Sequence, residues 1–186
     1  MIGYALCGSF CTLSRSLLVL EKLVAAGHSV QPVISERTYS TDTRFFLAEE
    51  LVRRVEEIAG REAIHTVEDA EPLGPHTPLE ALIIAPCTGN TLAKIAHGIT
   101  DSAVTMAAKA HLRADRPLLI ALATNDAMSQ NLGNVGTLLT RKSVYFVPMR
   151  QDDPNGKPYS LVADMQRIPE ALTAMLDGRQ LRPLFI

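Results

Sequence analysis

Short apolar segments alternate with longer segments of helical periodicity along this chain, and this alternation restricts the fold more than any other feature. The short segments predict buried strands at residues 2–7, 30–34, 63–67, 82–85, 118–122 and 144–147. Apolar residues at three- and four-residue spacing predict helices at 13–24, 47–58, 91–97, 102–112 and 160–176. Strands and helices that alternate in this way form parallel sheets through right-handed crossovers. We therefore predict a single domain over residues 1–186, a Rossmann-like, doubly wound parallel sheet of about six strands with helices on both faces.

Two segments refine this prediction. Pro32 lies inside the segment 30–34 and removes one ladder donor, which favours a place at the edge of the sheet. The Pro- and Gly-rich segment 71–78 predicts a loop before the strongest strand. The chain has no Trp and only 5% aromatic residues, so its core must consist mainly of aliphatic side chains. Buried parallel strands covered by helices have this composition.

Charge and cysteine content exclude several classes of protein. Eighteen basic and 20 acidic residues give a net charge of −2, so no basic field exists to attract nucleic acid or an anionic membrane. The longest apolar runs are far shorter than the ~20 residues of a membrane helix, and the N-terminus lacks the basic region of a signal peptide. Cys7, Cys11 and Cys87 are too few for a disulfide framework and lack partners for a metal site. We expect a cytoplasmic protein without a metal.

Small polar residues follow the first two predicted strands. In a parallel sheet, ligands bind beyond the carboxyl ends of the strands, where the winding reverses. Gly8 and Ser9 follow the first strand, and Ser35 follows the second. Neither dinucleotide-binding nor phosphate-loop motifs are present, but a glycine, a hydroxyl and a helix N-terminus are the parts of a phosphate cradle. The alternative is that Gly8-Ser9 simply caps an ordinary helix.

The turn after the strand 82–85 is more specific. Thr88, Asn90 and Thr91 place hydroxyl and amide groups in one turn, and Gly89 allows a flat ligand to approach the backbone. Capping of the next helix explains one of these polar residues but hardly three.

A third polar turn, Asn125-Asp126, follows the strand 118–122. It either faces a ligand or caps the helix that carries Leu132.

The remaining titratable residues give weaker signals. The five histidines are scattered, and His76 is the best catalytic candidate because it precedes the strand 82–85. Lys94, Lys109 and Arg113 are candidates to balance a phosphate, although solvated helix faces explain them equally well.

The segments 8–9, 35 and 86–101 resemble the flavoprotein family of FMN-binding cysteine decarboxylases and flavin prenyltransferases. In those proteins the third segment reads P-A-[ST]-A-N-T or P-C-S-M-K-T, followed by an alanine-rich helix and G-[IM]-x-D. The resemblance implies an FMN site and a homo-oligomer that binds FMN between subunits. The FMN-binding residues it implies are Gly8, Ser9, Ser35, Thr88, Gly89, Asn90, Thr91 and Thr105. The catalytic residues it implies are Asn125, in a degraded P-A-M-N motif, and His76, in a stretch similar to H-[IV]-x-L.

Further segments are similar to one branch of that family, the second subunits of a two-subunit enzyme that makes pyridine-2,6-dicarboxylate (dipicolinate). These segments are 41–45, 70–75, 85–91, 124–127, 145–148 and 151–154. The resemblance implies an oxidoreductase that aromatises dihydrodipicolinate during endospore formation. It also implies a partner A subunit that carries NAD(P), in agreement with the lack of G-x-G-x-x-G here. Asn125 is the implied residue to orient a substrate carboxylate, with Arg113 as a weaker candidate.

Departures from the family patterns leave alternatives open. Met106 stands where the prenyltransferases carry an arginine, which disfavours prenyl transfer. Thr124 replaces the methionine of P-A-M-N, which weakens the case for cysteine decarboxylation. The alternatives to a flavin-bearing oxidoreductase subunit are a non-catalytic partner with a vestigial flavin pocket and an FMN-dependent cysteine decarboxylase.

Overall fold

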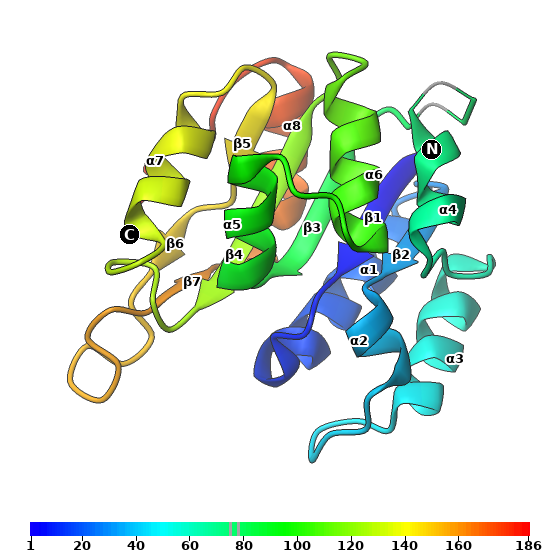
Figure 1. Cartoon of the computed structure of the whole chain (residues 1–186), viewed down its shortest axis with the longest axis horizontal. Helices are drawn as coiled ribbons and strands as arrows, with labels where there is room; N and C mark the ends of the chain where they lie inside the picture. Colours follow the sequence, from blue (N-terminus) through cyan, green and yellow to red (C-terminus); the bar gives the residue numbers. More distant parts are fainter. Residues whose placement is uncertain (75, 78) are drawn as a thin grey trace.

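The computed structural model describes residues 1–74, 76–77 and 79–186. Strands and helices alternate as predicted over most of the chain (Figure 1). The elements are β1 (Ile2–Leu6), η1 (Phe10–Thr12), α1 (Leu13–Ala25), β2 (Val30–Ile34), α2 (Glu36–Ser40), α3 (Ala48–Ala59), α4 (Val67–Ala70), η2 (Glu71–Leu73), β3 (Leu82–Cys87), α5 (Gly89–His97), α6 (Ala103–Leu112), β4 (Leu118–Thr124), α7 (Leu132–Leu139), β5 (Val144–Phe146), β6 (Met149–Arg150), β7 (Leu161–Ala163), η3 (Met165–Arg167) and α8 (Ile168–Leu176).

The sheet has seven strands, and its main part is parallel. The strand order is β2-β1-β3-β4-β7-β6, and β5 also pairs with β4. Strands β2, β1, β3, β4 and β5 run parallel, which confirms the predicted doubly wound α/β class. The outer edge of β4 is divided, because β5 pairs with residues 118–120 and β7 pairs antiparallel with residues 123–124.

The prediction of one helix over residues 160–176 is wrong in its first half. Leu161–Ala163 forms β7, and the helix α8 begins only at Ile168, after the short η3. Three residues are too few to display a strand period, and β7 exists because it pairs with β4, almost forty residues earlier in the chain. Local periodicity carries no signal for such a pairing.

Two other segments differ in detail from the prediction. Pro32 lies in β2, which is an edge strand of the sheet as expected, although Ile64 adds one isolated bridge to its outer side. That bridge is all that remains of the predicted strand 63–67, since α4 begins at Val67. The predicted loop 71–78 starts with the 3₁₀ helix η2, and its Pro75 and Pro78 lie outside the described residues.

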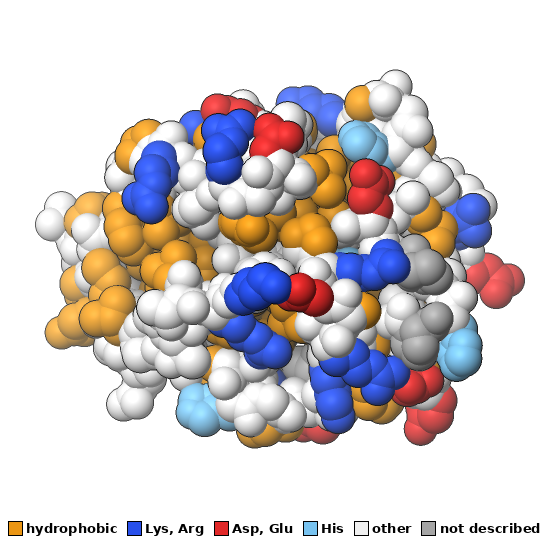
Figure 2. All heavy atoms as spheres, turned by 90° about the horizontal axis from the view of Figure 1, so that it is seen from above, with side chains coloured by type: hydrophobic (Ala, Val, Ile, Leu, Met, Phe, Trp, Pro, Cys, Tyr) orange, Lys and Arg blue, Asp and Glu red, His pale blue; other side chains and the backbone are white. Residues whose placement is uncertain are grey.

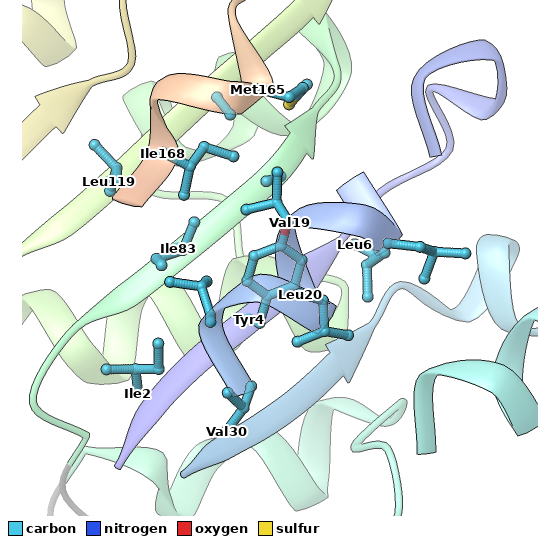
Figure 3. Packing of buried hydrophobic residues seen from close by; sticks show 14 of the residues in the cluster. Ile2, Tyr4, Leu6, Val19, Leu20, Val30, Ile83, Leu119, Met165 and Ile168 are labelled. Atoms are coloured by element: carbon cyan, nitrogen blue, oxygen red, sulfur yellow. The ribbon is translucent and has the colours of Figure 1, made fainter. Parts of the chain in front are cut away.

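Two apolar layers hold the helices on the sheet. On one face, Tyr4 and Ile83 pack against Leu20 of α1 and Ile168 of α8 (Figure 3). On the other face, the opposite side chains of the same strands, such as Ile84 and Ile120, pack against α5, α6 and α7. The alternation of side chains along each strand therefore fills both layers, as a doubly covered sheet requires.

The surface carries charges of both signs. Basic and acidic side chains lie close to one another on the face shown in Figure 2, in keeping with the net charge of −2. Across the described residues, no helix has the length and apolar character needed to span a bilayer.

Candidate functional site

The winding of the sheet reverses at β1. From β1 the chain continues to β2 on one side, and the next strand, β3, lies on the other side of β1. The carboxyl ends of β1, β2, β3 and β4 point to the same end of the molecule, the lower end in Figure 1. In open α/β sheets this point is where ligands bind. Two adjoining cavities lie there.

The first of them, here called the β1–β2 cavity, has a volume of about 640 Å³. The loops after β1, β2 and β3 and the end of α5 form its walls. It is lined by Cys7, Gly8, Phe10, Ser35, Glu36, Arg37, Thr88, Asn90, Thr91, Lys94, Asp101 and Ser102. Hydroxyl and amide groups and charges of both signs therefore surround a space of the size that small ligands occupy.

Helix capping accounts for two of the polar residues after β3. The Thr88 hydroxyl accepts a hydrogen bond from the Thr91 backbone N–H at 3.2 Å and donates to the Thr91 hydroxyl at 3.1 Å. The Thr91 hydroxyl then donates to Cys7 Sγ at 3.4 Å and joins α5 to β1. Asn90 differs from both, because its side chain is exposed to the cavity and has no hydrogen-bond partner among the described residues. Asn90 is thus the free polar group of this turn.

Two of the four charged residues that line the β1–β2 cavity compensate each other. Lys94 donates two hydrogen bonds of 2.8 Å to the carboxylate of Asp101, which lowers the pKa of Asp101. Glu36 accepts a hydrogen bond from the backbone N–H of Ala103 at the start of α6. Arg37 is exposed and makes no ion pair with any described residue. Its guanidinium is therefore available to a negatively charged ligand.

The second space, the β4 cavity, has a volume of about 460 Å³ and adjoins the first. Both cavities are lined by Gly8 and Thr88, so the loop after β1 separates them. Asn125 lines the β4 cavity with an exposed side chain that has no partner in the part of the chain that the structure describes.

Asp126 holds the floor of the β4 cavity in place. Its carboxylate accepts hydrogen bonds from the Thr124 hydroxyl and, at 2.9 Å, from the Asn131 amide. A Cβ added to Gly89 would lie 2.6–2.8 Å from these three side chains, so only glycine allows α5 to start so close to them. Asp126 and Asn131 therefore connect the turn after β4 with α7, while Asn125 faces the cavity.

Two positive charges line the β4 cavity. Lys157 forms a 3.0 Å ion pair with Asp152, which raises the pKa of Lys157. The Ser160 hydroxyl donates to Asp152 as well and is the main cause of the lowered pKa of that carboxyl. Arg15, in the first turn of α1, has no ion-pair partner among the described residues. It is the one basic side chain here without a compensating carboxylate in the described structure.

Of the three thiols, Cys7 lines the β1–β2 cavity and the exposed Cys11 lines the β4 cavity, while Cys87 is buried at the end of β3. Burial raises the pKa of Cys7 to about 11, and it also raises the pKa of Cys87. A thiolate nucleophile needs the opposite shift. Cys7 and Cys87 thus act as small apolar residues that leave room beside the loops.

The structure brings most of the predicted site residues together. Gly8, Ser35, Thr88, Asn90 and Thr91 line the β1–β2 cavity, whereas Ser9 and Asn125 line the β4 cavity. Gly89 lies between Thr88 and Asn90 and is buried.

Two predicted site residues lie elsewhere. His76 is exposed in the turn after η2, before the amino end of β3, and therefore at the opposite end of the sheet from both cavities. The Thr105 hydroxyl is buried and completes a capping box with Ser102 at the start of α6. Thr105 thus stabilises a helix end, while Ser102, its capping partner, lines the β1–β2 cavity.

The basic residues considered for phosphate or carboxylate binding lie in different places, and only Lys94 lines either of the two cavities. Lys94 reaches the β1–β2 cavity but is paired with Asp101. Arg113 pairs with Glu71 at 2.9 Å and, like Lys109, lies toward the far end of α6 from the cavities. Arg113 is therefore not in reach of a ligand beside Asn125 within one chain.

Sequence reasoning missed several lining residues. Phe10 and Arg37 follow Ser9 and Ser35 within one or two residues, so their closeness to strand ends was a usable signal. Arg15, Asp152 and Lys157 gave no such signal, because they reach the cavity only through α1 and through the loop between β6 and β7.

Comparison with known proteins identifies relatives along the whole chain. The B subunit of dipicolinate synthase from Bacillus subtilis (strain 168) is 43% identical over 185 residues, which cover 100% of this chain and 92% of that protein. The crystal structure of the corresponding dipicolinate synthase chain from Bacillus halodurans superposes with a TM-score of 0.91 at 40% identity, covering 100% of this chain and 95% of that chain. The FMN-dependent cysteine decarboxylase SpaF shares the fold, with a TM-score of 0.71 at 23% identity and 95% of each chain covered.

The family itself is matched over residues 1–170, from β1 to the first residues of α8, so that every loop lining the two cavities falls within the match. The resemblance inferred from the turns after the strands is thereby confirmed, and this chain belongs to the flavoprotein family.

Proposed function

We propose that this chain is the flavin-binding subunit of a dipicolinate synthase, an oxidoreductase that aromatises dihydrodipicolinate to dipicolinate during endospore formation. The observation that carries the proposal is the 43% identity along the full chain to the B. subtilis dipicolinate synthase chain. The two adjoining cavities support it, since one offers room for a cofactor and the other offers room for a substrate beside it.

The residues of the β1–β2 cavity fit FMN. Its volume of about 640 Å³ is sufficient for such a ligand. The backbone of Gly8 and the unpaired guanidinium of Arg37 would bind the phosphate at the ends of β1 and β2, beside the Ser35 hydroxyl, which caps α2 through Thr38. Asn90 has a free amide for the polar edge of the ring system, and Thr88 and Thr91 fix the turn that presents it. FMN bound here would supply a two-electron acceptor.

The β4 cavity is the substrate site in this proposal. Aromatisation of the dihydropyridine ring removes two electrons and two protons from the substrate. Asn125 donates a hydrogen bond from its free amide to a substrate carboxylate and so orients the ring. Asp126 and Asn131 keep the backbone of Asn125 in place. Gly8 after β1 and Thr88 after β3 line both cavities, so ligands in the two cavities would lie next to each other.

A partner subunit and self-association complete the proposal. The relative from B. subtilis is named as one subunit of its enzyme, which supports a partner A subunit here. In this proposal the A subunit carries NAD(P). Large exposed apolar side chains such as Leu18, Ile99 and Leu132 support a homo-oligomer, because they would be covered between copies of the chain.

Flavin binding tests the proposal directly. The purified protein should show the absorbance of bound FMN or acquire it on titration. Asn90→Ala should weaken FMN binding about three- to tenfold, the value of one hydrogen bond. Asn155→Ala, which removes an exposed asparagine of the loop between β6 and β7, should bind FMN like the wild type. A wild-type protein that binds no FMN, or an Asn90→Ala variant with unchanged affinity, contradicts the site.

A non-catalytic partner subunit is the second candidate. Thr124 stands where the decarboxylases have methionine, and its hydroxyl is held by Asp126. Reconstitution with the A subunit and NAD(P) separates the two functions. Dipicolinate formation that requires FMN on this chain supports the oxidoreductase, whereas full activity with flavin-free protein supports the second candidate.

A further inference from the structure

We infer that Arg15 is the specificity-determining residue of the β4 cavity and binds one carboxylate of a dicarboxylate substrate. The inference rests on the proposed function for the position of the substrate beside Asn125. It assigns to α1 a part in ligand recognition that the turns after the strands do not supply.

The charge balance of the β4 cavity singles out Arg15. Of the carboxylates that line the cavity, Asp126 is engaged by Thr124 and Asn131, and Asp152 is engaged by Lys157 and Ser160. Lys157 is therefore already neutralised. Arg15 has neither an ion pair nor a side-chain hydrogen bond with any described residue, so its guanidinium gives this cavity an uncompensated positive charge.

The position of Arg15 is fixed by its neighbour on the buried side of α1. The Ser16 hydroxyl donates to the backbone carbonyl of Ala85 in β3, and the Tyr4 hydroxyl donates to the Ser16 carbonyl at 2.9 Å. Leu13 and Leu17 are fully buried on the same face. The backbone that carries Arg15 is thus tied to β1 and β3, the two strands whose ends form the site, so only the side chain has to be ordered when a ligand binds.

The same guanidinium lines a third cavity, here called the α1 groove, which has a volume of about 740 Å³. Lys22, Arg150 and the β7 residue Val162 line this groove as well, and Val162 also lines the β4 cavity. Arg15 therefore stands at the junction of the two spaces. Lys22 lies two turns further along α1 and does not line the β4 cavity, so it provides a matched control for a positive charge on the same helix.

A guanidinium is suited to this role because it binds a carboxylate through two parallel hydrogen bonds. With Asn125 at one carboxylate and Arg15 at the other, the cavity would favour a ligand with two carboxylates over a ligand with one. The charge would also counter the negative charge that a dicarboxylate brings to a protein of net charge −2.

Titration calorimetry with pyridine-2,6-dicarboxylate and pyridine-2-carboxylate in metal-free buffer tests this inference. The wild type, supplemented with FMN, should bind the dicarboxylate about tenfold or more tightly than the monocarboxylate. Arg15→Gln should bind both ligands with similar, weak affinity, and Arg15→Lys should lie between that variant and the wild type. Lys22→Gln should retain the wild-type preference. Arg15 is exposed, so all variants should keep the wild-type unfolding midpoint.

Three results would overturn the inference. The first is a wild type without preference for the dicarboxylate, and the second is an Arg15→Gln variant that keeps the preference. The third is an equal loss of the preference in Lys22→Gln, which would mean that the general positive potential along α1, rather than Arg15 itself, sets the preference. An FMN titration of the same samples separates this failure from that of the proposed function. Arg15-dependent dicarboxylate binding without FMN binding refutes only the proposed function, and FMN binding without any effect of Arg15 refutes only the inference.

Discussion

At the scale of single residues, burial decides what the three thiols can do. Cys7 directly follows β1 and Cys87 ends the neighbouring strand β3. Both are buried, whereas Cys11 is exposed in η1. With a pKa of about 11, Cys7 is almost entirely protonated at neutral pH. A reactive cysteine at the cofactor cavity is therefore not part of the chemistry that this site offers.

Thiol titration checks this conclusion. The native protein should react rapidly with one equivalent of Ellman's reagent at pH 8, because only Cys11 is accessible. Native Cys11→Ser should show almost no rapid reaction, while the unfolded wild type should release three equivalents. Two or three rapidly reacting thiols in the native protein would mean that the ends of β1 and β3 open in solution.

The residues of the site were predictable where they adjoin a strand end. Asn90 and Asn125 follow β3 and β4 closely, so their position in the sequence already indicated a shared edge of the sheet. Arg15 and Lys157 were not predictable in this way. Arg15 reaches the cavity from α1, and Lys157 reaches it because the antiparallel pairing of β7 with β4 brings its loop there. His76 is close to β3 in the sequence but precedes its amino end, so it lies at the opposite end of that strand from the cavities.

At the scale of elements, α1 connects the site to the core. Its buried face contacts β1 and β3, and its exposed face carries Arg15 and Lys22 along the α1 groove. The side-chain hydrogen bond that joins this helix to the edge of the site comes from Ser16, which bonds to Ala85 just before the turn of Thr88. The packing of α1 and the shape of the two cavities are therefore coupled.

Ser16→Ala should destabilise this junction. The substitution leaves the Ala85 carbonyl buried without its donor, so the free energy of unfolding should fall by about 1–3 kcal/mol. Denaturant unfolding followed by circular dichroism measures the change. The matched control is Ser14→Ala in the same turn of α1, where the side chain is exposed. Because alanine has the higher helix propensity, that variant should be as stable as the wild type or more stable by a few tenths of a kcal/mol. Equal stability of both variants would show that the Ser16 bond contributes nothing.

The helices of the core were predictable from periodicity, but the last strands were not. α1, α3, α5 and α6 carry long apolar stripes that the sequence displays. β6 and β7 have two and three residues and depend on pairing with each other and with β4. Elements of this length owe their conformation to tertiary contacts, so local propensity leaves them undefined.

At the scale of the whole molecule, one buried histidine links global stability to pH. His111 lies in α6, fully buried against the start of β4, and its Nε2–H donates to the Pro117 carbonyl at 2.8 Å. Its Nδ1 has no partner within the described part of the chain. Burial lowers the pKa of His111 to about 4, so the folded protein holds this imidazole neutral.

The direction of the pH effect follows from this shift. The unfolded chain takes up a proton at His111 near pH 6.5, whereas the folded protein does so only near pH 4. In that interval the unfolded state binds more protons, and the free energy of unfolding falls as the pH falls. The full contribution is present above pH 6.5 and is lost by pH 4. Paired carboxyls such as Asp101 and Asp152 also lose their stabilising effect in acid, but from a reference pKa of 3.8 and thus mainly below about pH 5.

Urea unfolding at pH 7 and pH 5 isolates the histidine. The wild type should lose about 2 kcal/mol of unfolding free energy between these values through His111 alone. His111→Gln keeps a donor toward Pro117 but has no group that takes up a proton in this range. The loss of about 2 kcal/mol between pH 7 and pH 5 should therefore disappear in this variant, whatever the stability of the variant at pH 7. His97→Gln, which removes an exposed imidazole from α5, should retain the wild-type difference. If His111→Gln lost as much stability as the wild type, the buried imidazole would be charged in the fold, and another group would have to explain acid sensitivity. The outcome also matters for the site, because Ser102 caps the other end of α6. Protonation of His111 would therefore loosen the helix whose N-terminal cap lines the β1–β2 cavity.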